Sequence, residues 1–314
     1  MIAVVIPCYR VTKHILKVIN SIGPEVSRIY VVDDACPDGS GRLVDAECQD
    51  NRVHIIWHEK NQGVGGAMKS GYQQAITDEM EIVVKIDGDG QMNPNLIHKF
   101  VLPILKGEAD YTKGNRFYDL ENLTNMPRIR IFGNAVLSII SKFSTGYWNI
   151  FDVTNGYTAA HVKILKHLPF SKISNRYFFE TDMLFRMNTI RACVVDIPMN
   201  AVYADEKSNL NIKDIIFDFL IKHIKNTGKR IFYNYFLRDM TAASLELIIG
   251  LVLFLFGLFF GLFNWINAIS ANIPTPSGTI MLAALPTIIG LQMLLAFINF
   301  DVSNTPNRPI HNNL

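Results

Sequence analysis

The sequence predicts an α/β protein: a mostly parallel sheet with flanking helices, followed by amphipathic helices at a membrane surface and two transmembrane helices. Three observations predict this fold class. Strand-like and helical segments alternate over the first half of the 314 residues. The stretch 247–300 contains no Asp, Glu, Lys or Arg. Aromatic and basic residues are mixed just before that stretch.

The alternating half indicates βαβ units, because its apolar, β-branched runs are separated by helical patterns. The expected strands are 2–7, 28–34, 53–58, 81–87 and 109–114, and the expected helices lie near 12–22, 40–48, 64–77 and 94–106. In such sheets ligands bind at the carboxyl ends of the strands. Polar residues follow three of these strands: Pro7 to Tyr9, Asp33 with Asp34, and Asp87 with Asp89. This coincidence predicts a single cleft.

The segment KIDGDGQ (85–91) predicts a cation site. Asp87 and Asp89 face one side of an extended chain, where two carboxylates repel unless a cation or a proton lies between them. Oxygen ligands favour Mg²⁺ or Mn²⁺, and two acids alone imply that a phosphorylated partner completes the shell. Gln91 is the next residue on that side if the chain stays extended. An Asp-Gly hairpin turn explains the spacing equally well, but the acids at neighbouring strand ends favour the cation.

The glycine-rich stretch 61–75 is not a phosphate loop, since Met68 precedes Lys69 where that motif needs glycine. It opens a helix, so its N–H groups could assist an anion, although close helix–sheet packing explains the glycines as well. Four cysteines show no metal-ligand spacing and are expected to be free thiols in a reducing compartment. They are Cys8, Cys36, Cys48 and Cys193.

The segments 247–263 and 280–300 each approach the roughly 20 residues that cross a bilayer. Buried core helices are the alternative, but these rarely run so long without a charge. The positive-inside rule predicts that both ends lie in the cytoplasm, because basic residues flank the spans and the connecting loop 264–279 has no charge. No N-terminal signal peptide pattern is visible. The flanking basic residues are Lys222, Lys225, Lys229, Arg230, Arg238 and Arg308.

Two segments before the first span, 211–225 and 229–240, combine an apolar face or aromatics with basic residues. We expect both to be helices on the cytoplasmic membrane surface; linker helices packed on the domain are the alternative. A further amphipathic helix is expected over 128–144. The expected domains are therefore a cytoplasmic catalytic domain (1–210), juxtamembrane helices (211–240), two spans (241–300) and a cytoplasmic tail (301–314).

An ordered set of motifs resembles family 2 glycosyltransferases. It comprises VVIPCYR (4–10), VVDDACPDGSG (31–41), NQGVGGAMKSGY (61–72), KIDGDGQMNP (85–94) and KGNRF (113–117). RIRIFGN (128–134), DVTNGYTA (152–159), FFETD (178–182) and DEKSNL (205–210) extend the likeness to the polyprenyl-phosphate glycosyltransferases. These include dolichyl-phosphate mannose synthases and bacterial undecaprenyl-phosphate glucosyltransferases. The likeness covers residues 1–215, and the two-span tail is similar to that of the bacterial members.

The resemblance implies a GT-A fold and roles for single residues. Pro7 and Tyr9 correspond to the segment that lines the nucleotide base, and Asp34 to the acid that hydrogen-bonds it. Asp87 and Asp89 match the D-x-D motif that holds the metal and the donor, with Gln91 as a further metal ligand.

The remaining implied roles concern the acceptor and the sugar. Arg116 and Arg130 fall where relatives have arginines facing the acceptor phosphate; for each, a surface or helix-stabilising charge is the alternative. Glu180 and Asp182 match an acidic motif near the sugar. Lys207 and Ser208 lie in the loop that covers the site and reaches the acceptor phosphate.

The chain also departs from the family pattern. Arg10 and Val11 stand where relatives have Asn and an acid, so base selection can differ. Gly88 replaces an alanine that is common between the two aspartates. A Q-x-x-R-W motif is absent, which argues against polymerisation.

The expected function is inverting, metal-dependent transfer of one sugar from a UDP- or GDP-sugar to a membrane polyprenyl phosphate. A phosphate nucleophile is already anionic at neutral pH, so no strong general base is needed. Two alternatives are a membrane glycosyltransferase with another lipid or glycan acceptor, and a non-catalytic nucleotide-sugar-binding membrane protein. The expected partners include a homo-oligomer but no nucleic acid. The expected catalytic residues are Asp89, Arg116, Arg130, Glu180 and Asp182.

Overall fold

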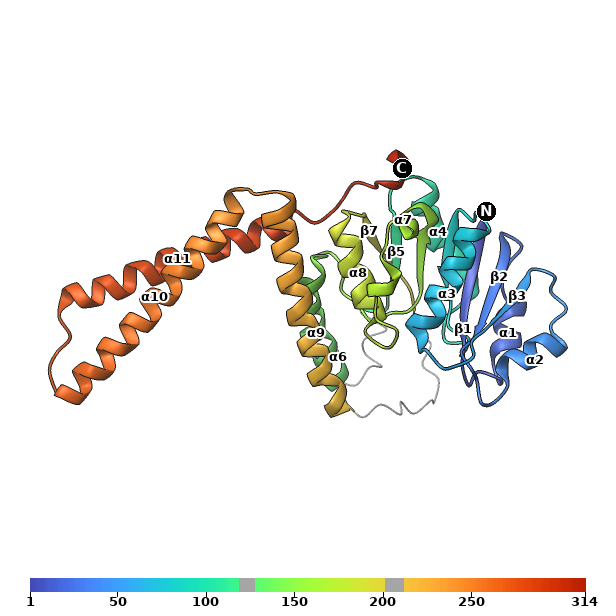
Figure 1. Ribbon diagram of the computed structural model, residues 1–314, viewed down its shortest axis with the longest axis horizontal. Helices are drawn as coiled ribbons and strands as arrows, with labels where there is room; N and C mark the ends of the chain where they lie inside the picture. Colours follow the sequence, from blue (N-terminus) through green and yellow to red (C-terminus); the bar gives the residue numbers. More distant parts are fainter. Residues whose placement is uncertain (119–127, 201–211) are drawn as a thin grey trace. The chain divides into compact units, whose positions relative to one another are not determined.

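The computed structural model describes residues 1–118, 128–200 and 212–314. They form two compact units, residues 1–227 with 306–314 and residues 228–305. The first unit contains a seven-stranded sheet in the order β3-β2-β1-β4-β6-β5-β7 (Figure 1). The strands are β1 (Ile2–Cys8), β2 (Val26–Asp33), β3 (Val53–Trp57), β4 (Ile82–Lys85), β5 (Tyr111–Asn115), β6 (Thr158–His161) and β7 (Val194–Pro198).

The mostly parallel sheet predicted from the sequence is confirmed. Strands β1 to β4 pair in parallel, as do β5 and β7, whereas β6 runs antiparallel to β4 and β5. Strands β6 and β7 were not predicted, because TAAH and VVDIP are too short to show a period. Strand β6 nevertheless matters for the site, since it places the loop 152–157 beside the end of β4.

Helices cover both faces of the sheet, so its central strands β1 and β4 are buried on both sides. In β1, Ala3 and Val5 belong to one apolar core, and Val4 and Ile6 belong to the other. Burial on both faces explains why these strands read as continuous apolar runs. The described helices that lie wholly within this unit are α1 (Ile15–Asn20), α2 (Ser40–Glu47), α3 (Val64–Thr77), α4 (Ile97–Leu105), α6 (Arg128–Thr145), α7 (Val162–Lys166) and α8 (Phe179–Thr189), with 3₁₀ turns Pro94–Leu96, Phe170–Lys172 and His311–Asn313.

The segments 211–225 and 229–240 do not form two separate helices as predicted. A continuous helix α9 (Ile212–Phe232) is followed directly by a π-helix, η3 (Tyr233–Arg238). Gly228 lies inside α9, where an isolated glycine costs about 1 kcal/mol of helix propensity but does not end the helix. The predicted helix over 128–144 is confirmed as α6.

The second unit contains the helices α10 (Ala242–Ala271) and α11 (Ser277–Ser303), which lie side by side. Both are long and apolar enough to cross a membrane, and 11% of the most apolar window of each is buried. Such exposure does not fit the alternative of buried core helices and indicates a membrane protein. Small residues allow the close packing: a Cβ on Gly290 would lie 2.4 Å from the backbone nitrogen of Phe254.

A buried cluster of charged and polar side chains connects α9 and η3 with the end of α11. The Arg230 guanidinium donates to both carboxylate oxygens of Asp301, at 2.6 and 2.9 Å. The Tyr235 hydroxyl donates to the same carboxylate at 2.6 Å. Because each charge has a hydrogen-bonded partner, the cluster avoids most of the penalty of an unpaired buried ion.

Two buried histidines of the first unit predict acid sensitivity. Burial lowers the pKa of His161 and that of His223 to about 4. Below about pH 6.5 the unfolded chain therefore binds these protons before the folded chain does, so stability falls as the pH drops from 6.5 towards 4. The loss at pH 5 is about 2 kcal/mol for each histidine. Asp196 opposes this trend below pH 6, because burial raises its pKa to about 6.

The measurement is the chemical-denaturation midpoint of the full chain between pH 7.5 and 5. His223→Leu should remove its share of the slope, and His98→Leu, at an exposed position of α4, is the control for replacing a histidine by leucine. Equal slopes in wild type and His223→Leu would show that this histidine is not held neutral.

Candidate active site

The predicted acid loop lies directly after β4, at the carboxyl end of the parallel strands. Gly90 has φ = +78°, and the backbone N–H of Gln91 donates to the Asp89 carboxylate at 2.9 Å. The chain therefore turns after the strand, and it continues into α4 without forming a hairpin. This excludes the hairpin alternative. Because the chain turns here, an extended backbone no longer places Gln91 on the same side as the two acids. A role of Gln91 as a metal ligand therefore stays a prediction from the resemblance.

The acid loop suits a divalent cation that takes few protein ligands. Asp87 Oδ1 is buried, and its charged partner is the Lys85 ammonium at 3.0 Å. Within the described ranges, no three His, Cys, Asp or Glu side chains form a metal-binding group. Mg²⁺ and Mn²⁺ can complete such a two-carboxylate site with water and substrate phosphate oxygens.

Glu180 joins the acid loop through a buried lysine that sequence reasoning missed. The Lys85 ammonium is 3.2 Å from Glu180 Oε1, in the first turn of α8, as well as 3.0 Å from Asp87. The Lys85 side chain is 2% exposed. Burial alone would lower its pKa, but the two carboxylates outweigh burial and raise it above the ordinary lysine value. The lysine is therefore a permanent cation between two acids.

Asp182 lies in the same helix but has other partners. Its carboxylate accepts hydrogen bonds from the backbone N–H and hydroxyl of Ser174, at 2.9 and 3.2 Å, and from the Asn226 amide at 3.2 Å. Residues two apart on a helix do not share a face. The structure thus brings Glu180, but not Asp182, next to Asp87, and a role of Asp182 at the sugar stays a prediction.

Arg116 follows β5 and is held by an acid that the sequence did not single out. Its guanidinium donates twice to the buried Asp152, at 2.7 and 2.9 Å. The loop of Asp152 reaches the acid loop, since a Cβ on Gly156 would lie 2.9 Å from Asp87 Oδ2. Arg116 is thereby fixed to the loop that borders Asp87. The Arg130 side chain, Lys207 and Ser208 lie outside the described residues.

The predicted donor residues differ in accessibility. Tyr9 is 41% exposed, and the Arg10 guanidinium lies over its ring, 5.4 Å from the centroid. Pro7 is half-buried at the end of β1. A contact of these residues with a nucleotide base stays a prediction, but the exposed ring leaves room for one.

Asp34, in contrast, is only 2% exposed and has internal partners. Its carboxylate accepts hydrogen bonds from the backbone of Gln62 and Gly63, at 2.8 and 2.7 Å, and lies 2.7 Å from His58 Nδ1. His58 Nε2 in turn is 2.8 Å from the Ser70 hydroxyl. These contacts connect Ser70, His58 and Asp34 in the way that a Ser-His-Asp catalytic triad is connected. Asp34 also holds the loop before α3, through its bonds to the backbone of Gln62 and Gly63. A bond from Asp34 to a nucleotide stays a prediction.

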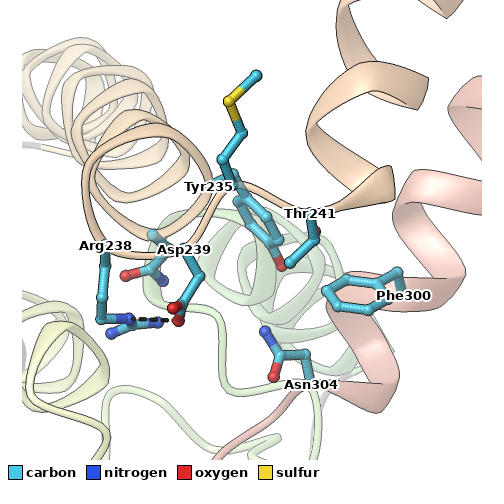
Figure 2. A pocket seen from close by; sticks show the side chains of 8 residues that line it. Tyr235, Arg238, Asp239, Thr241, Phe300 and Asn304 are labelled. Carbon is cyan, nitrogen blue, oxygen red and sulfur yellow. Dashed lines mark hydrogen bonds and ion pairs between the residues drawn. The ribbon is translucent and has the colours of Figure 1, made fainter.

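The second unit has a pocket of about 300 Å³ that contains none of the predicted site residues. Figure 2 shows Arg238 and Asp239 paired in it, at 3.4 Å, with Thr241 at the start of α10 and Phe300 and Asn304 at the end of α11. The Asp239 side chain is 70% exposed, so this ion pair is worth at most about 1 kcal/mol. A catalytic role for the acid loop of the first unit stays a prediction.

The sheet order, with the acid loop at the carboxyl end of β4, is that of the GT-A fold. The crystal structure of glucosyl-3-phosphoglycerate synthase from Mycobacterium tuberculosis in complex with UDP has the same fold, with a TM-score of 0.57. The structural match covers 73% of this chain and 80% of that chain. At 18% sequence identity it shows the fold alone.

The family follows from sequence comparison. The family model described as Glycosyl transferase family 2 matches residues 3–168, and the chain belongs to this family. The UDP-N-acetylglucosamine–dolichyl-phosphate N-acetylglucosaminyltransferase of Methanococcus voltae is 28% identical, over 65% of this chain and 87% of that protein. The polyprenol monophosphomannose synthase of Mycolicibacterium smegmatis is 27% identical, over 68% and 83%. The predicted glycosyltransferase family is confirmed.

Proposed function

We propose that this enzyme transfers one sugar from a UDP- or GDP-sugar to a polyprenyl phosphate in the membrane. The observation that carries the proposal is a family 2 catalytic domain on the same chain as two apolar helices of membrane-spanning length. The relatives named above act on dolichyl phosphate or polyprenol phosphate, by their names. A lipid acceptor explains the two apolar helices, because such helices keep the enzyme in the membrane that contains the acceptor.

The residues divide the chemistry between the donor and the acceptor. Asp87 and Asp89 would hold Mg²⁺ or Mn²⁺, which when bound offsets charge on the departing nucleoside diphosphate. Glu180 lies at the same point and orients sugar hydroxyls by accepting their hydrogen bonds. Arg116 offers the acceptor phosphate a guanidinium that is already oriented by Asp152. The acceptor oxygen attacks the anomeric carbon from the face opposite the diphosphate, which inverts the configuration.

The membrane arrangement forms part of the proposal. The catalytic domain and both ends of the chain lie in the cytoplasm, by the positive-inside rule. Helix α9 supports an interfacial position, because Phe217, Leu220 and Ile224 are 42–69% exposed on it. These residues recur at i, i+3 and i+7, which places them on one face. An apolar face of this kind would be covered by the headgroup layer.

A donor screen tests the proposal. Membranes containing the full-length protein are incubated with radiolabelled UDP- or GDP-sugars, Mn²⁺ or Mg²⁺, and undecaprenyl phosphate. The expected result is label in an acid-labile, organic-extractable lipid that depends on both the acceptor and the metal. Label in another lipid or in a glycan would support the alternative acceptor class, and no transfer with any donor would contradict the proposal.

A further inference from the structure

Lys85 is a buried cation that touches two acids of the candidate site. It is the last residue of β4, and the other residues of that strand, Ile82 to Val84, are apolar. Its ammonium contacts Asp87 in the following loop and Glu180 in α8. We propose that Lys85 is a positioning residue: it holds Asp87 and Glu180 together in the geometry that accepts the metal–nucleotide complex. This inference rests on the proposed function.

Stability alone does not explain a lysine at this place. Removing an ammonium from water carries a penalty of several kcal/mol, and replacing a buried ion pair by apolar side chains is often neutral or stabilising. A strand whose neighbouring positions are all apolar would accept another apolar residue. The lysine is explained by its two partners, Asp87 in the following loop and Glu180, which lies 95 residues from Lys85 in the chain.

The space around the Lys85 ammonium is confined. A Cβ on Gly156 would lie 2.3 Å from Lys85 Nζ and 2.9 Å from Asp87 Oδ2. Gly156 precedes β6, in which Thr158 is the register partner of Lys85. The backbone of this loop therefore closes the space beside the ammonium. A lysine confined in this way fixes the positions of both carboxylates, which would otherwise repel each other and separate.

Strand β5, which is separated from β4 by β6, offers a matched control. Lys113 in β5 is also fully buried, at 0% exposure, but its ammonium donates to the backbone carbonyl of Asn155. Lys85→Met and Lys113→Met thus remove the same group at the same depth. They differ in that the Lys85 ammonium contacts Asp87 and Glu180, whereas the Lys113 ammonium bonds to a backbone carbonyl and acts on Glu180 through its charge alone.

The experiment measures Mn²⁺ affinity by electron paramagnetic resonance, on the full-length protein in detergent with saturating UDP or GDP and no sugar transfer. We expect Lys85→Met to weaken Mn²⁺ binding at least tenfold and Lys113→Met to change it less than threefold. The double variant Lys85→Met/Glu180→Gln removes one charge of each sign at the site. It should recover most of the lost affinity, which a general packing defect would not do.

Wild-type affinity in Lys85→Met would overturn the inference, and so would a double variant as weak as the single one. If Lys85→Met does not fold, Gly156→Ala is the second variant, because its methyl group displaces the ammonium and crowds Asp87 Oδ2 without removing a charge. An unchanged Mn²⁺ affinity in Gly156→Ala would then overturn the inference. Failure of the wild type to bind Mn²⁺ with either nucleotide would instead overturn the proposed function, and the inference with it.

Discussion

Asp89→Asn is expected to lower the rate of sugar transfer roughly 100- to 1000-fold, because a metal that stabilises the leaving diphosphate contributes several kcal/mol. The substitution keeps the shape of the side chain. It also keeps an oxygen that can accept the hydrogen bond from the Gln91 backbone. What is lost is one of the two negative charges expected to hold the cation. The initial rate of labelled-sugar transfer, at saturating donor and several Mn²⁺ concentrations, measures the effect.

The matched control is Asp45→Asn, at an exposed acid on α2 that belongs to no predicted site. It should transfer sugar at the wild-type rate. Both variants should melt within about 2 °C of wild type, because asparagine keeps the size and shape of the replaced side chain. If Asp89→Asn kept more than a tenth of the activity, the metal role of the acid loop would be wrong. If the protein instead binds a nucleotide sugar without catalysing transfer, the wild type should show no transfer either.

The fold was predictable wherever burial leaves a long local pattern. Strands buried on both faces read as apolar runs, and the charge-free stretch 247–300 marks both long apolar helices. Strand β6 could not be predicted, because its four residues are defined by pairing with β4 and β5. The continuity of α9 was missed for a related reason: Gly228 signals a break locally, but a single glycine does not overcome the helix on either side.

The candidate site was predictable in its parts but not in its pairings. Acids after strand ends are visible in the sequence, and the topology brings such ends together. The partner of each charge is set by contacts between distant segments, such as Lys85 with Glu180 and Arg116 with Asp152. A sequence also does not distinguish an acid that faces a ligand from one that anchors a loop. Asp34 is the example, since its carboxylate accepts backbone hydrogen bonds inside the protein.

Asp110→Ala is expected to have the largest effect on stability, because one fully buried carboxylate binds two segments distant in sequence. Asp110 is 0% exposed. It accepts hydrogen bonds from the backbone of Cys193 at 2.7 Å and of Ile310 at 3.0 Å. His311 contributes its backbone N–H at 2.9 Å and its ring Nδ1 at 2.7 Å. The last residues of the chain, 306–314, are thereby attached to the sheet of the first unit.

Removal of the carboxylate leaves these donors without their acceptor, at roughly 1–3 kcal/mol for each that stays buried. The segment 306–314 can detach and become hydrated, which limits the loss to roughly 3 kcal/mol and the fall in melting temperature to about 5–10 °C. His311→Ala removes the ring contact with Asp110 and the stacking of the ring on His161 but keeps the backbone hydrogen bond, so it should cost less than Asp110→Ala. Thermal melting of the full chain in detergent ranks the two variants. Hydrogen exchange of the amides of Ile310 and His311 then separates the causes: fast exchange in Asp110→Ala identifies detachment of the segment, whereas wild-type protection in a variant that melts normally would show that Asp110 does not hold it.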